Sequence, residues 1–218
     1  MRPKNEVARL IEDIGIIPVV RASRHEQALK AASAVAAGGI PIVEITMTVP
    51  GAIDVIRELR KSMDAGVVIG AGTVLDAKTA AKCVAAGAEF IVSPGFNRAT
   101  VRYAKREGIL VMAGGLTPNE VITAWNAGSD YVKVFPCGNV GGPSYIRALK
   151  AALPQIPMVP TGGVSAATAA QFLEAGAAAL GIGGELVSGD SEAITQKARQ
   201  LVAIVQAARS GAQASGSR

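Results

Sequence analysis

A short phrase recurs four times along the chain and constrains its fold more than any other feature. It consists of alanine, glycine and a further small residue, and its glycines occupy positions 38, 87, 128 and 176, at spacings of 49, 41 and 48 residues. Each phrase ends an alanine-rich segment and precedes an apolar run, which is the usual place of a glycine between a helix and a strand. A spacing of this size is too long for one strand and one helix and suits two such pairs. Four repeats therefore predict eight strands that alternate with helices.

Eight short apolar runs lie where this repeat predicts strands. They are residues 16–22, 42–47, 67–73, 90–95, 110–115, 131–136, 158–163 and 179–184. Helical patterns separate them, for example residues 79–86 and residues 118–127, where Thr117 is a candidate N-cap and Pro118 the first helical residue. A further helical pattern near residues 5–14 precedes the first strand. The pattern predicts an α/β fold, a (β/α)8 TIM barrel with an extra N-terminal helix; an open doubly wound sheet is the alternative.

The composition favours a single folded domain. Half of the 218 residues are hydrophobic and 18% are charged, which provides enough apolar surface for a large core. No linker rich in proline, serine or glycine interrupts the chain before its end. We therefore assign residues 1–207 to one barrel domain, and residues 208–218, which are mostly small or polar, to a flexible C-terminal tail.

The distribution of charge excludes some classes of partner. The formal charge is +5, but the basic residues are dispersed and aromatic residues make up only 4% of the chain, so nothing resembles a nucleic-acid-binding surface. The charge suits a small anionic substrate, with a merely solvated basic surface as the alternative. No run reaches the roughly 18 apolar residues that a membrane span needs, and no signal peptide is recognisable.

Cysteine and histidine usage indicates a cytoplasmic protein without a histidine-based metal site. Cys83 and Cys137 belong to no Cys-x-x-Cys motif, so reduced thiols are the simplest interpretation. His25 is the single histidine, and one histidine argues against a metal site of that kind.

One lysine stands inside an apolar run, where an unpaired ammonium is costly to bury. Lys133 lies between Val132 and Val134. Side chains alternate along a strand, so Lys133 faces the barrel interior if the two valines face the helices. The same alternation turns Glu44 inward from residues 42–47. These runs are the second and sixth strands, and alternate strands of a barrel fill the same layers, so we expect the two charges to meet.

A buried lysine beside a carboxylate is suited to Schiff-base chemistry. Both Lys133 and Glu44 lie toward the C-terminal ends of their strands, where barrel enzymes keep their catalytic groups. Burial disfavours the charged form of an amine, and a free amine attacks the carbonyl carbon of a keto substrate. Glu44 is then placed to carry protons. The alternative is a buried ion pair that only fixes the packing.

Two glycine pairs follow the last two strands. Gly162 and Gly163 come after Thr161, and Gly184 ends the second pair. Glycine lets backbone N–H groups approach a phosphate closely, and the N-terminus of a following helix adds its dipole. Loops after the seventh and eighth strands are the usual phosphate site of a TIM barrel. These turns therefore predict a phosphate-binding cradle, with glycines that only permit tight turns as the alternative.

Five motifs occur in order between about residues 16 and 187: Val43-Glu44-Ile45-Thr46, Gly70-Ala71-Gly72-Thr73-Val74-Leu75, Ile91-Val92-Ser93-Pro94-Gly95, Lys133-Val134-Phe135-Pro136 and Pro160-Thr161-Gly162-Gly163. Together they resemble the 2-keto-3-deoxy-6-phosphogluconate (KDPG) aldolase family, also called the KHG/KDPG aldolases. The resemblance implies a class I aldolase that works without a metal or another cofactor. Lys133 would form the Schiff base with the keto carbon, and Glu44 would be the general acid and base, acting through water.

The same resemblance implies a substrate and its contacts. A 2-keto-3-deoxy-6-phospho sugar acid would be cleaved reversibly to pyruvate and glyceraldehyde 3-phosphate. Thr73 and Pro94 would line the pyruvate pocket, Phe135 would pack beside the imine, and the glycines of the cradle would hold the phosphate. Members of the family form homotrimers, so the resemblance implies a homotrimer here.

Two positions depart from the family pattern. Thr48 stands where the best-known members carry an arginine for the substrate carboxylate, and Arg21, at the end of the first predicted strand, is a candidate substitute because a guanidinium grips a carboxylate with two hydrogen bonds. A surface arginine is the alternative. Glu185 stands where those members have a serine, and we expect its carboxylate to point outward, complementing the helix N-terminus. Both departures concern the ends of the substrate, so the galactonate-derived epimer and the unphosphorylated 4-hydroxy-2-oxoglutarate (KHG) stay open.

Two hypotheses from other functional classes stay open as well. The first is a sugar-phosphate epimerase or isomerase in which Glu44 is the base and Lys133 an electrostatic stabiliser. The second is a barrel that binds a phosphorylated metabolite without catalysis, in which the two charges are a packing pair. Neither forms a covalent adduct with pyruvate.

Overall fold

The computed structural model describes residues 1–215, and the side chains of residues 1–210. Eight parallel strands form one sheet in this part of the chain: β1 (Ile16–Val20), β2 (Ile42–Thr46), β3 (Val68–Gly72), β4 (Phe90–Val92), β5 (Leu110–Gly115), β6 (Tyr131–Val134), β7 (Met158–Pro160) and β8 (Leu180–Ile182). Every residue of these strands is buried, because one face lines the barrel interior and the other meets the helices. Burial on both faces explains why the strands are continuous apolar runs in the sequence.

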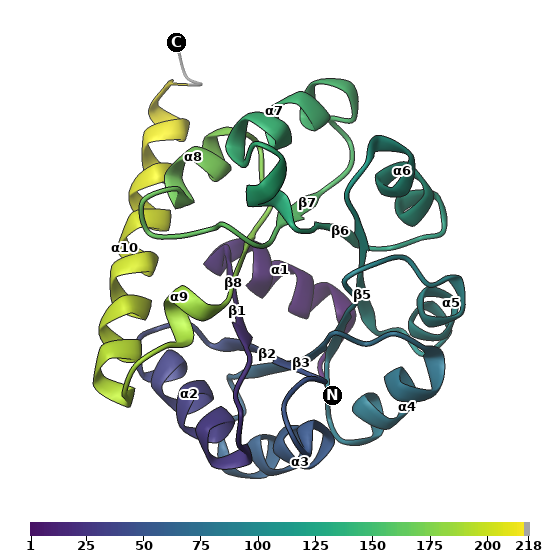
Figure 1. Cartoon of the computed structure of the whole chain (residues 1–218), viewed down its shortest axis with the longest axis vertical. Helices are drawn as coiled ribbons and strands as arrows, with labels where there is room; N and C mark the ends of the chain where they lie inside the picture. The colour runs from purple at the N-terminus through teal and green to yellow at the C-terminus, as the bar shows by residue number, and fades with distance from the viewer. Residues whose placement is uncertain (216–218) are drawn as a thin grey trace.

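Helices alternate with the strands, and most of them form an outer ring (Figure 1). They are α1 (Lys4–Ile14), α2 (His25–Ala37), α3 (Ala52–Ser62), α4 (Ala77–Ala85), α5 (Arg98–Arg106), α6 (Pro118–Asn126), α7 (Pro143–Ala152), α8 (Ala169–Glu174), α9 (Gly184–Val187) and α10 (Ser191–Ser215), with a 3₁₀ turn, η1 (Cys137–Val140). The N-cap predicted at Thr117 is confirmed: its side chain accepts a hydrogen bond from the Glu120 N–H, and Glu120 bonds back to the Thr117 N–H. No helix of the described chain is both long and apolar enough to cross a bilayer.

The strand order closes the sheet into a barrel. Neighbouring strands follow the chain from β1 to β7, and β1 also pairs with β8 in a parallel register that sets Ile16 beside Leu180. A bridge between Thr161 and Gly181 joins β7 to β8. The (β/α)8 barrel is therefore confirmed, and the open doubly wound sheet is wrong, because such a sheet has two unpaired edges.

The recurring glycines end helices as predicted, with one change of position. Gly87, Gly128 and Gly176 all have positive φ, a conformation that side-chain-bearing residues rarely adopt. In the first phrase the residue with positive φ is Gly39, whereas Gly38 has a φ of −82°. The first turn thus has the same length as the others but lies one residue later in its phrase, with Gly39 in the position that Gly87, Gly128 and Gly176 occupy.

Helix α1 closes the N-terminal end of the barrel and lies across the ring of strands in Figure 1. Its Val7 and Ile11 are buried. Glu12 accepts a hydrogen bond of 2.5 Å from the Tyr131 hydroxyl, and Lys4 lies 2.6 Å from a carboxylate oxygen of Asp130, the residue directly before β6. The extra N-terminal helix predicted from the sequence therefore seals one mouth of the barrel and leaves the other mouth to the loops that follow the strands.

The C-terminal helix extends into the segment assigned to the tail. Helix α10 runs to Ser215 and packs against α2 and α8, where the Thr195 hydroxyl donates to the carbonyl of Ala34 (Figure 1). Residues 208–215 are helical, because alanine, a strong helix former, outweighs the single glycine at position 211. Flexibility of residues 208–218 stays a prediction. Residues 216–218 of the expected tail lie outside the described residues.

Candidate active site

The two charges that the strand alternation predicts to meet do so inside the barrel. Lys133 Nζ lies 3.7 Å from Glu44 Oε1, and each side chain is only 3% exposed. This distance is within reach of an ion pair but too long for a hydrogen bond. Glu44 Oε1 is buried and has no hydrogen-bond partner among the described residues. An unsatisfied buried oxygen costs free energy, so the pair is not optimised for packing and is a candidate reaction centre.

A glycine in the neighbouring strand makes room for the Glu44 carboxylate. Gly72 of β3 pairs in register with Thr46 of β2, and a Cβ atom at position 72 would collide with Glu44 Oε1. Any larger residue at this position would displace the carboxylate. Sequence reasoning missed this role, although a glycine inside a strand pattern is a signal of close approach.

The surroundings of Lys133 come from β5 and from the loop after β4. Gly114 of β5 pairs in register with Lys133, and a Cβ atom on Gly114 would collide with the backbone of Pro94. The loop that carries Pro94 therefore folds over β5 next to the lysine. The Phe135 ring also lies close to the lysine: its centroid is 5.5 Å from Lys133 Nζ, a distance at which a ring attracts a cation.

Thr73 has a strained backbone at the end of β3. Its φ is +57°, and it is the one residue other than glycine with positive φ in the described part of the chain. A β-branched residue is a genuine outlier in this region. The hydrogen bond from the Val74 N–H to the Val92 carbonyl, 3.1 Å long, holds the chain directly after it. Such strain is typical of functional sites, where it fixes a side chain in one direction.

A cavity of about 300 Å³ opens at the C-terminal ends of β7, β8 and β1. It brings together six of the residues selected from the sequence, together with Glu185 and neighbouring residues of the same loops: Arg21, Phe135, Thr161, Gly162, Gly163 and Gly184. Thr73 and Pro94 do not line this cavity; they follow β3 and β4 on the side of the mouth nearer Glu44. The candidate site thus has a deep polar pair and a shallower glycine-lined cavity.

The glycine loops of the cavity are tightly joined to the end of β6. Gly162 and Gly163 have φ values of 84° and 77°. The Gly138 N–H donates to the Gly162 carbonyl at 2.8 Å, and a Cβ atom on either Gly138 or Gly163 would press against the other residue. Phe135 precedes a cis peptide bond to Pro136 in the same region, which the sequence did not reveal.

Glu185 lies between two cavities at the C-terminal end of β8. It is exposed and lines both the glycine-lined cavity and a smaller one of about 140 Å³ that it shares with Ala166 and Lys197. Its Oε1 accepts a hydrogen bond of 3.2 Å from the backbone N–H of Ala166, in the loop after β7. The residue is thus exposed, as expected from the sequence, but its bonded oxygen has a partner in a neighbouring loop and not at the N-terminus of its own short helix, α9.

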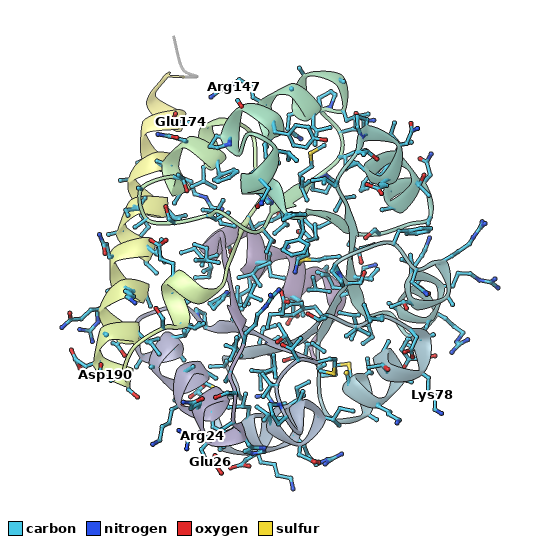
Figure 2. All side chains as sticks on the ribbon, viewed as in Figure 1. Arg24, Glu26, Lys78, Arg147, Glu174 and Asp190 are labelled. Carbon is cyan, nitrogen blue, oxygen red and sulfur yellow. The ribbon has the colours of Figure 1, made fainter. Side chains whose placement is uncertain are left out.

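Thr48, a neutral residue, occupies the position at which the best-known members of the family carry the carboxylate-binding arginine. The Thr46 hydroxyl donates to the Val20 carbonyl at 3.0 Å, so the Thr48 hydroxyl, 2.7 Å from that of Thr46, donates to it in turn. Arg21 is exposed and lines the glycine-lined cavity. It also lines a second cavity, of about 440 Å³, whose lining includes Asp190, labelled at the edge of the molecule in Figure 2. Arg21 is thus placed at the mouth, nearer the glycine loops than the sequence suggested.

The two cysteines are buried free thiols. Burial raises the pKa of Cys83 to about 11, with a smaller contribution from the charge of Asp76, and burial alone raises that of Cys137 to about 11. Both are therefore protonated near neutral pH, and neither offers a thiolate nucleophile. Within the described residues, no group of three or more histidine, cysteine, aspartate or glutamate side chains gathers where it could hold a metal ion.

Comparison with known proteins gives a consistent result. The family model described as KDPG and KHG aldolase matches residues 7–205. A 2-dehydro-3-deoxy-phosphogluconate aldolase of Treponema pallidum is 34% identical over 202 residues, which are 89% of this chain and 95% of the relative.

Two solved structures superimpose on most of this chain. A cube-shaped protein cage, designed by fusing symmetric oligomeric domains, superimposes with a TM-score of 0.87 at 30% identity, covering 94% of this chain and 76% of that one. The KDPG aldolase of Legionella pneumophila, with pyruvate captured as a covalent carbinolamine intermediate, has a TM-score of 0.78 at 27% identity, covering 95% and 98%. With its barrel, its buried lysine and glutamate, and a family match over nearly its whole length, the chain belongs to the KDPG and KHG aldolase family.

Proposed function

We propose that this protein is a class I aldolase, a lyase that cleaves a 2-keto-3-deoxy acid reversibly to pyruvate and an aldehyde. The observation that carries the proposal is the buried amine of Lys133 at 3.7 Å from the unsatisfied Oε1 of Glu44. A nucleophile beside a proton carrier, both shielded from water, is what imine chemistry needs. The chain's membership of an aldolase family supports the same reaction.

The first half of the reaction forms the imine. Lys133 passes a proton to Glu44, and the resulting amine attacks the keto carbon. The proton that the nitrogen releases on attack goes to the carbonyl oxygen, which gives a carbinolamine. Glu44 then delivers a proton to the hydroxyl group, which leaves as water while the nitrogen lone pair forms the C=N bond. A water molecule between the carboxylate and the reacting atoms is compatible with the 3.7 Å separation, which is too long for a direct hydrogen bond.

The second half breaks the carbon–carbon bond. Glu44 removes the proton of the C4 hydroxyl, the C3–C4 electron pair moves into the iminium to form an enamine, and C4 leaves as the aldehyde. Protonation of the enamine at C3 and hydrolysis of the imine release pyruvate and restore the amine. The protonated imine is the electron sink, so the reaction depends on Lys133 more than on any other residue.

The remaining site residues hold the substrate. Thr73 and Pro94, at the ends of β3 and β4, line the pyruvate pocket, and Phe135 packs beside the imine. Arg21 takes the place of the absent arginine and pairs with the substrate carboxylate; its exposed guanidinium at the cavity mouth supports this role. The glycine loops, with Thr161, receive the far end of the aldehyde half.

The substrate class is a 2-keto-3-deoxy sugar acid such as KDPG or a close relative. The family description itself names two substrates, KDPG and KHG. An epimerase or a non-catalytic barrel is not favoured, because the family that the chain belongs to is one of aldolases.

We propose further that the protein is a homotrimer in the cytoplasm. The likeness to a cage component built from symmetric oligomeric domains supports an oligomer, and two buried free thiols are compatible with a reducing compartment. Measurement of the mass in solution, by light scattering after size exclusion, tests the trimer directly.

The activity is tested by pyruvate release. The protein is incubated with KDPG and, in parallel, with KHG, and pyruvate is followed by the NADH consumed in a coupled lactate dehydrogenase assay. We expect steady release by the wild type from at least one of the two substrates and a loss of at least about four orders of magnitude in kcat for Lys133→Met, because the covalent step disappears. Conversion of the sugar acid to an epimer without pyruvate would support the epimerase instead.

A further inference from the structure

The cavity that should receive the far end of the aldehyde carries a carboxylate. Glu185 lines it together with Gly162, Gly163 and Gly184. Its Oε1 accepts a hydrogen bond of 3.2 Å from the Ala166 N–H, so one carboxylate oxygen is bound at the rim of this cavity although the residue is exposed. The proposed aldolase mechanism gives this residue no task.

This carboxylate opposes a phosphate group in two ways. A phosphate dianion next to a carboxylate is repelled. Glu185 also occupies the N–H of Ala166, which belongs to the same loop after β7 as Gly162 and Gly163. No ion pair of the described side chains includes Glu185.

If the proposed function is correct, the Arg21 guanidinium at the cavity mouth binds the substrate and does not neutralise the charge of Glu185. Arg21 lines the same cavity, but the keto acid brings its own carboxylate, and the neutral Thr48 stands where a cation is expected for it. With Arg21 engaged at that carboxylate, Glu185 is the charge that faces the other end of the substrate.

The donors and acceptors that remain suit hydroxyl groups. The N–H groups of Gly163 and Gly184 donate to no backbone carbonyl within the described chain, and Glu185 has a second carboxylate oxygen that accepts hydrogen bonds. A hydroxyl group both donates and accepts, so a hydroxylated end satisfies both kinds of partner, whereas a phosphate dianion only accepts.

We infer that Glu185 is a specificity-determining residue that selects an aldehyde half with an uncharged, hydroxylated end over one that ends in phosphate. The substrate of this enzyme is accordingly an unphosphorylated 2-keto-3-deoxy acid. This inference rests on the proposed aldolase function and names the substrate class for the same site.

The test compares two aldehydes that differ only in the phosphate group. Condensation of pyruvate with glyceraldehyde or with glyceraldehyde 3-phosphate is measured for the wild type, Glu185→Gln and Glu185→Ser. We expect the ratio of kcat/KM for the phosphorylated over the neutral aldehyde to rise about tenfold or more in both variants, because the repelling charge is removed and the Ala166 N–H is freed. Thermal unfolding confirms that the exposed substitutions leave the fold intact.

A matched control separates this local effect from the change in net charge. Glu174→Gln removes the same charge at the last residue of α8, on the outside of the ring (Figure 2). We expect the ratio to stay at the wild-type value in this variant. A rise in Glu174→Gln equal to that in Glu185→Gln would overturn the inference, since the effect would then come from the overall charge.

The outcomes distinguish this inference from the proposed function. Trapping of pyruvate on Lys133 by borohydride involves no aldehyde and is independent of Glu185. Wild type that traps pyruvate but shows the same or a lower ratio after Glu185→Gln and Glu185→Ser overturns the inference alone. Wild type that traps no pyruvate overturns the proposed function, and the inference with it.

Discussion

Two glutamates are buried in this barrel, one near each end, and their surroundings differ. Glu89 directly precedes β4, at the end closed by α1, and its carboxylate receives hydrogen bonds from the guanidinium groups of Arg2 and Arg60, at 2.8 Å and 3.0 Å. Glu44 lies in β2, toward the open end, with Lys133 at 3.7 Å and one oxygen without a hydrogen-bond partner among the described residues.

The difference separates stability from reactivity within one barrel. Paired and hydrogen-bonded charges at the closed end leave no atom available, so Glu89 can only hold the N-terminal segment against the strands. At the open end an incompletely satisfied pair is retained at a cost in free energy, and the nearby strain at Thr73 adds to it. We expect the two ends to respond oppositely to the same substitution.

Neutralising Glu44 tests the open end and should have the largest effect. In Glu44→Gln the proton carrier is lost, and we expect kcat for pyruvate release to fall about a thousandfold. The free energy of unfolding should fall less than in the matched substitution at the closed end, because Lys133 loses an ion pair of 3.7 Å but no hydrogen bond at Oε1. Urea denaturation beside the kinetic assay measures both quantities, and a variant with near wild-type kcat would remove Glu44 from the mechanism.

The matched substitution at the closed end should have the opposite result. In Glu89→Gln the guanidinium groups of Arg2 and Arg60 lose their counter-charge, and we expect the free energy of unfolding to fall by about 3 kcal/mol. The kcat per folded molecule should be unchanged, since Glu89 lies at the other end of the barrel. A large loss of kcat with wild-type stability would contradict the separation of the two ends.

Relief of the strain at Thr73 should improve stability and impair activity. Asparagine adopts the left-handed region more readily than threonine, so Thr73→Asn should raise the free energy of unfolding by about 1 kcal/mol. We expect kcat/KM to fall, because the side chain that lines the pyruvate pocket changes shape. Lower stability of the variant would show that the threonine side chain makes a compensating contact.

The smallest effect is expected at Thr117, the N-cap of α6, which belongs neither to the pair of Lys133 and Glu44 nor to the ion pairs of Glu89. Thr117→Ala should lower the free energy of unfolding by about 1 kcal/mol at neutral pH and leave kcat alone. Hydrogen bonds from the backbone N–H groups of Thr117 and Leu116, and from the Thr117 side chain, lower the pKa of Glu120. Its contribution is therefore complete above the pKa of the unfolded chain and is lost as the pH falls through the lower folded value. Glu120→Gln should thus differ from the wild type at neutral pH and converge with it in acid.

Much of the architecture and the central pair could be predicted from the sequence because both depend on periodicity. The glycine repeat gave eight strands, and alternation along two of them turned Lys133 and Glu44 toward each other. The extent of the last helix could not be predicted, because residues 208–215 combine alanines, which favour a helix, with glycine and serine, which disfavour one.

The details of the site could not be predicted because they depend on contacts between loops. The rotamer of Glu185 is set by the Ala166 N–H, nineteen residues earlier in the chain, and no local pattern shows that these loops meet. The positive φ of Thr73 is likewise imposed by the hydrogen bond from Val74 to the end of β4. Local propensity in fact argues against that conformation for a threonine.

The most direct test of the account is to trap the imine. The protein is incubated with pyruvate and sodium borohydride, which reduces the C=N bond to a stable secondary amine, and the modified residue is located by peptide mass spectrometry. We predict one carboxyethyl adduct, on Lys133, which is absent without pyruvate and absent in Lys133→Met. A protein that binds pyruvate without any adduct, or with an adduct on another lysine, would contradict the assignment of Lys133 as the nucleophile.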